Sequence, residues 1–100
     1  FGKVFFVVID MKKKSKNYLK HKCWVLNHEK PTLILVPPHF ANAYLCLSKK
    51  CVFHYKWHYK GKYIDSNKQK SYRWNDPKFK IKWPIKKPIL SKRDKTSNFL

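Results

Sequence analysis

The segment from Lys78 to Trp83 alternates strictly between lysine and large apolar side chains, and this alternation constrains the fold more than any other feature. Phe79, Ile81 and Trp83 occupy every second position, so in an extended chain they lie on one face and the lysines on the other. Such a pattern is typical of a half-buried β-strand. No segment shows helical spacing over three turns, and the sequence therefore predicts an all-β fold.

Further segments resemble strands because they are rich in β-branched and aromatic side chains and are separated by polar turns or prolines. They are Lys3–Asp10, Tyr18–Leu26, Thr32–Val36, Ala43–Leu47 and Cys51–Tyr59. The last two flank a Ser-Lys-Lys turn and predict a hairpin. Short strands separated by turn signals are typical of a sandwich or barrel of the jelly-roll kind.

The length and the start of the chain limit its organisation. One hundred residues, 43% of them hydrophobic, suffice for one domain with a modest core. No apolar run approaches the roughly 18 residues that span a bilayer, and the N-terminus has no signal-peptide pattern. We therefore expect a soluble cytoplasmic protein with no membrane partner. The chain opens on Phe1 in a strand-like segment, so we expect it to be a fragment.

The net charge of +19 raises the possibility of a polyanionic partner. One alternative is a small basic β-barrel that binds single-stranded nucleic acid through lysines and stacked aromatic rings. However, Arg73 and Arg93 are the only arginines among 24 basic residues, and arginine supplies the planar fork that grips phosphates and guanine edges. Lysines are spread along nearly the whole chain. We therefore favour a solvated lysine-rich surface and expect no nucleic-acid partner.

The cysteines and histidines do not form a metal-binding pattern. Cys23, Cys46 and Cys51 contain no CxxC pair, and their odd number is unpromising for a disulfide framework. Cys46 and Cys51 lie near the ends of two expected strands, yet buried free thiols are the better interpretation. The nearest histidines, His54 and His58, have no cysteine or carboxylate close in sequence. We expect no metal site.

The expected strand Cys51–Tyr59 carries aromatic side chains on one face, namely those of Phe53, Tyr55, Trp57 and Tyr59. If this face points into a small barrel, the Tyr55 phenol lies in a concave and largely apolar cavity, where ligands usually bind. The alternative is an aromatic core layer whose hydroxyls reach the rim. On the alternation alone, the aromatic core layer is the better interpretation.

Six motifs occur in the order that a known enzyme family would place them. They are VVID at 7–10, LVPPHFANAY at 35–44, FHYK at 53–56, WNDP at 74–77, IKWP at 81–84 and PILSKRD at 88–94. In this order they resemble the dTDP-4-dehydrorhamnose 3,5-epimerase family. They are more similar still to its relatives that epimerise GDP-linked 4-keto-6-deoxy-heptoses in capsule biosynthesis.

This resemblance implies a cupin-type jelly roll that needs no metal or organic cofactor and forms a homodimer when complete. Residues 1–100 would be the C-terminal part of a single domain whose N-terminal strands are missing. The substrate would be a nucleotide-diphosphate sugar. The family removes a proton from the carbon beside the 4-keto group and returns one to the opposite face, which requires a base and an acid on either side of the ring.

The resemblance also assigns roles to individual residues. Tyr55 matches the family's acid, and a phenol is protonated at neutral pH and can donate to an enolate carbon. The family's base is a histidine that would precede Phe1, as would an oxyanion-stabilising lysine. Asp94 matches the aspartate that orients that histidine. The isolated chain is therefore expected to be catalytically incomplete.

The segment PPHFANAY departs from the rhamnose-pathway pattern. His39 replaces a glycine, and a glycine in such a turn often serves a positive φ angle. Asn42 replaces an active-site histidine; it cannot act as a base but can hydrogen-bond a sugar hydroxyl or the keto oxygen. This change argues against the rhamnose substrate. His39, Asn42, Trp57 and Lys92 are the expected substrate contacts.

Overall fold

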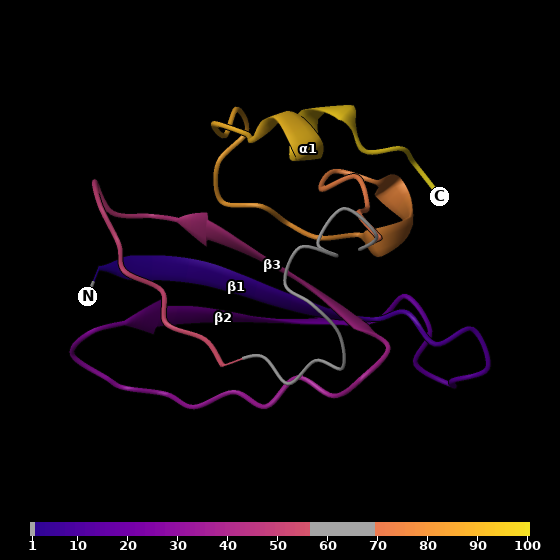
Figure 1. The fold of residues 1–100 in the computed structure, drawn as a ribbon, viewed down its shortest axis with the longest axis horizontal. Coiled ribbons are helices and arrows are strands. Elements are labelled where there is room, and N and C mark those ends of the chain that lie inside the picture. Colours follow the sequence, from indigo (N-terminus) through magenta and orange to yellow (C-terminus); the bar gives the residue numbers. More distant parts are fainter. Residues whose placement is uncertain (1, 57–69) are drawn as a thin grey trace.

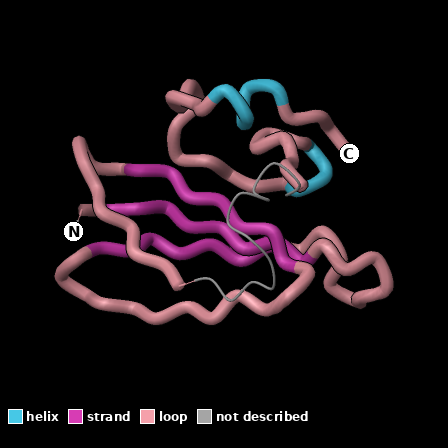
Figure 2. Tube along the Cα trace, viewed as in Figure 1, coloured by secondary structure: helices cyan, strands magenta, loops and turns pink. Residues whose placement is uncertain are grey.

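A computed structural model describes residues 2–56 and 70–100 (Figure 1). Its centre is a three-stranded antiparallel sheet of β1 (Lys3–Asp10), β2 (His21–Asn27) and β3 (Phe40–Cys46) in the order β2-β1-β3. The C-terminal region adds a 3-10 helix, η2 (Pro77–Phe79), and a short α-helix, α1 (Lys92–Thr96). Both pack on one side of the sheet (Figure 2).

β1 is the central strand, although it opens the chain. It pairs with β2 over Lys3–Ile9 and with β3 over Val4–Asp10, so its backbone amides and carbonyls have partners on both sides. Every residue from Phe6 to Asp10 is buried. A strand buried on both faces is expected to have a nearly continuous apolar sequence. The predicted bounds of this strand are confirmed.

The two faces of the sheet differ in what covers them. Val7 and Ile9 of β1 form the core with Phe79, and Ile81 and Trp83 pack against this cluster. We call this side the covered face. Side chains at the alternate positions of β1 point to the opposite side, which we call the aromatic face.

The C-terminal segment is not the predicted strand, but its pattern of burial is as predicted. Phe79 is buried and Ile81 and Trp83 are partly buried, whereas the lysines between them are exposed. Asp76 caps η2 by accepting a hydrogen bond from the Lys78 amide, and Lys80 ends this helix with a left-handed φ of 53°. The segment therefore lies across the sheet without pairing to it.

The WNDP motif anchors the C-terminal region. The buried Asp76 carboxylate accepts hydrogen bonds from the amides of Lys78 at 2.9 Å and Leu100 at 2.7 Å. These bonds, that of Leu100 above all, hold the pKa of Asp76 below its ordinary value. The Trp83 indole donates to the Trp74 carbonyl at 2.9 Å. The motif is therefore a structural element that holds chain segments together.

Several predicted boundaries are corrected by the structure. β2 begins at His21, because the preceding residues form a turn in which Leu19 has a φ of 67°. β3 runs Phe40–Cys46 and so starts three residues before the predicted Ala43. Thr32–Val36 is not a strand: the side chains of Leu33 and Leu35 are 98% and 90% exposed.

The remaining differences concern the predicted hairpin and a helix. Residues 51–56 of the predicted strand Cys51–Tyr59 are not in strand conformation, and 57–59 lie outside the described residues. α1 was not predicted, because its five residues are shorter than the three turns over which helical spacing was sought. The cysteines are free thiols, as expected, but are only partly buried.

Candidate functional site

On the aromatic face, a continuous row of aromatic rings crosses the three strands. Trp24 and Tyr44 are the neighbours of Phe6 on β2 and β3. The ring centroid of Phe6 lies 6.0 Å from that of Trp24 and 5.4 Å from that of Phe53. Phe53 in turn stacks on Tyr44 at 5.0 Å. The row of rings therefore joins the sheet to the segment that follows β3.

Tyr55 lies at the exposed end of this row of rings. Its ring centroid is 6.4 Å from that of Phe53, and its side chain is 63% exposed. The phenol is thus held beside the aromatic face but is not enclosed in a cavity of the described residues. Asn42 is exposed and lies opposite Val8 of β1, so it points to the same face. Trp57 lies outside the described residues.

His39 occupies the turn that leads into β3. Its φ is 70°, the left-handed conformation expected at a position where the family pattern has glycine. Its carbonyl accepts a hydrogen bond from the Met11 amide at 3.0 Å. The backbone at this position therefore fixes the end of β1 to the start of β3, and the side chain of His39 is exposed.

Asp94 and Lys92 are separated from Tyr55 by the sheet. Both are exposed in the first turn of α1, where the Ser91 hydroxyl accepts a hydrogen bond from the Asp94 amide at 3.2 Å. Arg73 donates to the Lys95 carbonyl at 3.0 Å and so ties α1 to the segment on the covered face. Figure 1 shows α1 on one side of the sheet and residues 51–56 ending on the other.

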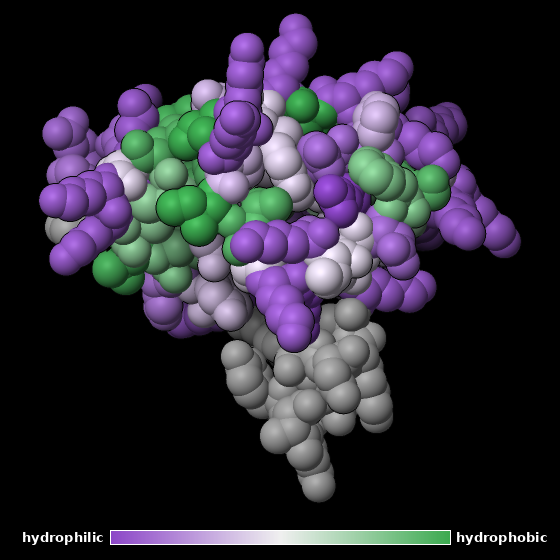
Figure 3. Space-filling model, turned by 90° about the horizontal axis from the view of Figure 1, so that it is seen from above, coloured by the Kyte–Doolittle hydropathy of each residue, from purple (hydrophilic) through white to green (hydrophobic). Residues whose placement is uncertain are grey.

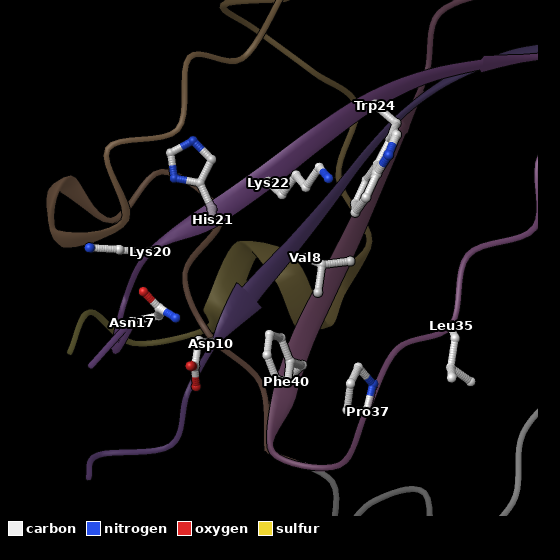
Figure 4. Close-up of a pocket in the computed structure, with 10 residues that line it drawn as sticks. All are labelled: Val8, Asp10, Asn17, Lys20, His21, Lys22, Trp24, Leu35, Pro37 and Phe40. Atoms are coloured by element: carbon white, nitrogen blue, oxygen red, sulfur yellow. The ribbon is translucent and has the colours of Figure 1, made fainter. Parts of the chain in front are cut away.

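A hollow of about 280 Å³ opens on the aromatic face beside β2. Its walls are mostly apolar, and Figure 4 shows them around one space. They come from Val8, Trp24, Leu35, Pro37 and Phe40. Lys20 and Lys22 lie at its rim, and the Lys22 ammonium is 5.4 Å from the centroid of the Trp24 ring. An apolar concave surface with a few polar groups is the usual form of a ligand site.

The residues of this hollow were not singled out from the sequence. A signal was nevertheless present: Lys22 and Trp24 lie two positions apart and therefore share one face of β2. These side chains line a hollow together with Leu35 and Pro37, which lie more than ten positions further along the chain. That distance is why the alternation of β2 alone did not reveal a site.

Asp10 closes the polar end of the hollow. Its buried carboxylate accepts hydrogen bonds from the Ser15 hydroxyl at 2.6 Å and the Lys12 amide at 2.9 Å. The bond from Ser15 is the main reason that the pKa of Asp10 is below its ordinary value. The ionised carboxylate therefore organises the turn between β1 and β2.

The comparisons with known proteins agree with this arrangement of motifs. The sequence profile of the family described as dTDP-4-dehydrorhamnose 3,5-epimerase matches residues 1–100, which is the whole chain. The chain belongs to this family. The resemblance inferred from the motifs is thereby confirmed.

Curated members of the family are similar to the chain along most of its length. The dTDP-4-dehydrorhamnose 3,5-epimerase of Shigella flexneri is 30% identical over 96 residues, which are 93% of this chain and 50% of that enzyme. Enzymes of the same name from Pseudomonas aeruginosa and Salmonella typhimurium are each 31% identical, over 94% and 99% of the chain. The chain spans about half the length of these relatives.

A solved structure of the family shares the fold. The dTDP-6-deoxy-D-glucose-3,5-epimerase RmlC of Legionella pneumophila, crystallised with dTDP-4-keto-L-rhamnose, superposes with a TM-score of 0.77. The match covers 98% of this chain and 51% of that enzyme at 24% identity. The predicted all-β, cupin-type fold is thereby confirmed, and the sheet β2-β1-β3 is the portion of it that the described residues form.

Nothing in these findings supports the nucleic-acid alternative. Figure 3 shows hydrophilic side chains projecting from all around one face of the molecule, whereas a phosphate track would concentrate them along one groove.

In the part of the chain that the structure describes, no helix has the length and apolar character needed to cross a membrane.

Proposed function

We propose that the protein carrying these residues is a nucleotide-sugar epimerase that inverts C3, C5 or both carbons of a 4-keto-6-deoxy sugar. The observation that carries this proposal is the family match over residues 1–100, supported by the names of the curated relatives. The aromatic face supplies the chemical setting, because it combines apolar walls with a phenol and an amide at its surface. The reaction inverts a carbon beside the ketone. The phenol can return the proton to that carbon, and the amide can contact the sugar.

Tyr55 is the proposed acid and Asn42 the proposed contact to the sugar. A phenol can deliver its proton to the enolate carbon once a base has removed the original proton from the other face of the ring. The Asn42 amide can donate a hydrogen bond to the keto oxygen, where negative charge develops. The positions of both residues on the aromatic face support this pairing.

Asp94 is proposed to orient the imidazole of a histidine base and to stabilise its protonated form. In the described part of the chain no hydrogen bond joins the Asp94 carboxylate to a histidine, and Tyr55 lies on the other side of the sheet. The described residues therefore do not bring Asp94 and Tyr55 together at one site, and the proposal for Asp94 rests on its match to the family motif. His39, Trp57 and Lys92 remain proposed substrate contacts on the same ground, although Lys92 lies beside Asp94 in α1.

The substrate is proposed to be other than the rhamnose precursor, because Asn42 stands where the rhamnose pattern has histidine. A GDP-linked 4-keto-6-deoxy-heptose of capsule or lipopolysaccharide biosynthesis fits this departure. Residues 1–100 are proposed to be the C-terminal part of one cupin-like domain in a homodimer without an organic cofactor or metal. The proposed location is the cytoplasm, which cell fractionation tests.

Proton exchange tests the proposed chemistry. The protein expressed from its complete reading frame is incubated with a 4-keto-6-deoxy nucleotide sugar in deuterated buffer, and deuterium at C3 and C5 is followed by NMR. We expect Tyr55→Phe to slow turnover by about a hundredfold or more, the usual contribution of a positioned acid. Normal exchange and turnover by Tyr55→Phe would refute the assignment.

Tyr72→Phe is the matched control. It removes the same hydroxyl group from a tyrosine that packs against the cluster on the covered face, where its ring meets Phe79 at 6.3 Å. This variant should exchange deuterium at the rate of the unaltered protein. An equal loss of exchange in both variants would mean that Tyr55→Phe acts through the fold and not through the acid.

A further inference from the structure

We infer that Cys46 and Cys51 form a redox-active thiol pair, which a small disulfide such as glutathione disulfide converts reversibly into a protein disulfide. The two residues flank the turn formed by residues 47–50. A bond between their sulfurs fastens the segment that carries Tyr55 to the end of β3. This inference goes beyond the proposed function and does not depend on it.

The stacked rings beside the turn bring the two cysteines next to each other. Phe53 stacks on Tyr44, with ring centroids 5.0 Å apart and an interplanar angle of 12°. Cys46 follows Tyr44 by two positions in β3, so both side chains lie on the same face of the sheet. Cys51 precedes Phe53 by two positions, and both are partly buried whereas Val52 between them is exposed. The chain therefore returns after the turn with Cys51 beside Cys46.

Contacts with the start of β1 hold the turn in place. The Ser48 hydroxyl accepts a hydrogen bond from the Lys3 amide at 3.0 Å, and the Cys46 thiol donates to the Ser48 carbonyl at 3.1 Å. A Cβ atom at Gly2 would lie 2.7 Å from the Cys51 Cβ, so the close approach of Cys51 requires glycine there. Both cysteines are thus positioned by the fold while they are still reduced.

Hydrogen bonding between the two thiols gives them different roles. It is the main reason that the pKa of Cys46 lies below its ordinary value, and it raises the pKa of Cys51. Cys46 is therefore the thiol that more readily becomes a thiolate, the form that attacks a disulfide. Both side chains are only partly buried, so a small disulfide can reach them.

The exchange proceeds in two steps. The Cys46 thiolate attacks one sulfur of glutathione disulfide, which forms a mixed disulfide and releases a glutathione thiolate that takes up a proton. Cys51 then loses its proton and attacks the Cys46 sulfur, which releases the second glutathione. Two protein thiols are oxidised and one glutathione disulfide is reduced to two thiols. In a reducing compartment such as the proposed cytoplasm, the pair stays reduced until an oxidant accumulates.

The third cysteine is a control within the same chain. Cys23 lies opposite Val7 of β1 and packs against the core cluster on the covered face. The sheet therefore separates its thiol from those of Cys46 and Cys51. Cys23→Ser should leave the exchange unchanged.

Peptide mapping after incubation with glutathione disulfide tests this inference. The protein expressed from its complete reading frame is reduced, incubated, acidified and alkylated. Trypsin and a glutamate-specific protease then place the three cysteines in separate peptides, because they cut after Glu29 and after Lys49 and Lys50. We expect linked Cys46 and Cys51 peptides to exceed the glutathione adduct of Cys46 by about tenfold or more, because the second thiol already lies beside the first.

The variants and a reductant complete the test. Dithiothreitol should release the linked peptides, and Cys51→Ser should instead accumulate the glutathione adduct of Cys46. Absence of the linked peptides from both the unaltered protein and Cys23→Ser overturns the inference, whether Cys46 carries glutathione or stays reduced. Linkage of Cys23 as often as of the pair also overturns it. If Cys51→Ser does not fold, the unaltered protein and Cys23→Ser decide the question alone.

Discussion

Replacing Phe79 with alanine should remove the main contact between the C-terminal segment and the sheet. The Phe79 side chain is 2% exposed and forms the core cluster with Val7 and Ile9. Its ring also meets that of Tyr72 at 6.3 Å, edge to face. Truncating a buried phenylalanine costs about 3–5 kcal/mol, because the lost contacts leave a cavity. The total free energy of unfolding of a domain is only about 5–15 kcal/mol.

Urea denaturation followed by circular dichroism measures this loss. For a domain of this size the dependence on urea is about 1–1.5 kcal/mol per molar, so the midpoint should fall by about 2 M or more. Phe99→Ala is the matched control: Phe99 is 56% exposed, and its ring contacts the guanidinium of Arg73 at 5.1 Å. This contact is worth about 0.5–1 kcal/mol. Equal losses in the two variants would refute the assignment of Phe79 to the core.

Two further predictions concern titrating groups. Hydrogen bonds from the backbone amides of Leu100 and Lys78 lower the pKa of Asp76. Its ionised form therefore stabilises the fold above about pH 4, and that stabilisation is lost as the pH falls further. The difference in urea midpoint between the unaltered protein and Asp76→Asn should therefore shrink on going from pH 7 to pH 3; a constant difference would contradict this. Hydrogen bonding with the Cys51 thiol, and then with Ser48, lowers the pKa of Cys46, whereas burial raises the pKa of Cys23. Iodoacetamide at pH 8 should thus modify Cys46 before Cys23 in mass spectra, and the reverse order would count against this geometry.

Part of the fold follows directly from local sequence. The bounds of β1 are predicted as Lys3–Asp10 and observed as Lys3–Asp10, because an unbroken run of β-branched and aromatic side chains suits a strand with partners on both sides. The positive φ of His39 is likewise predicted, from the glycine that the family pattern has there. The first feature depends on the residues of the strand themselves, and the second on the match to the family pattern.

Other predictions fail because a strand requires a partner. Thr32–Val36 has the composition of a strand, yet among the described residues no neighbouring strand pairs with it. The segment from Lys78 to Trp83 alternates as a strand does, but the cap by Asp76 and the left-handed Lys80 bend its backbone away from any ladder. α1 begins because the Ser91 hydroxyl caps it, a signal too short to register as helical periodicity.

The candidate site, like the fold, could be predicted from the sequence only in part. Asn42, Tyr55 and Asp94 could each be chosen from motifs, but not their arrangement: the structure places Asn42 and Tyr55 on the aromatic face and Asp94 on the other side of the sheet. The hollow beside β2 also forms only when a distant loop approaches the Trp24 ring.

The sequence by itself determined the family, the central strand and the burial of Phe79, Ile81 and Trp83 between exposed lysines. Tertiary structure alone decided which segments cover each face of the sheet and which side chains meet there. The physical reason is one of range. Alternation and turn chemistry act between residues a few positions apart, whereas a site is assembled by packing between segments that the order of the chain does not bring together.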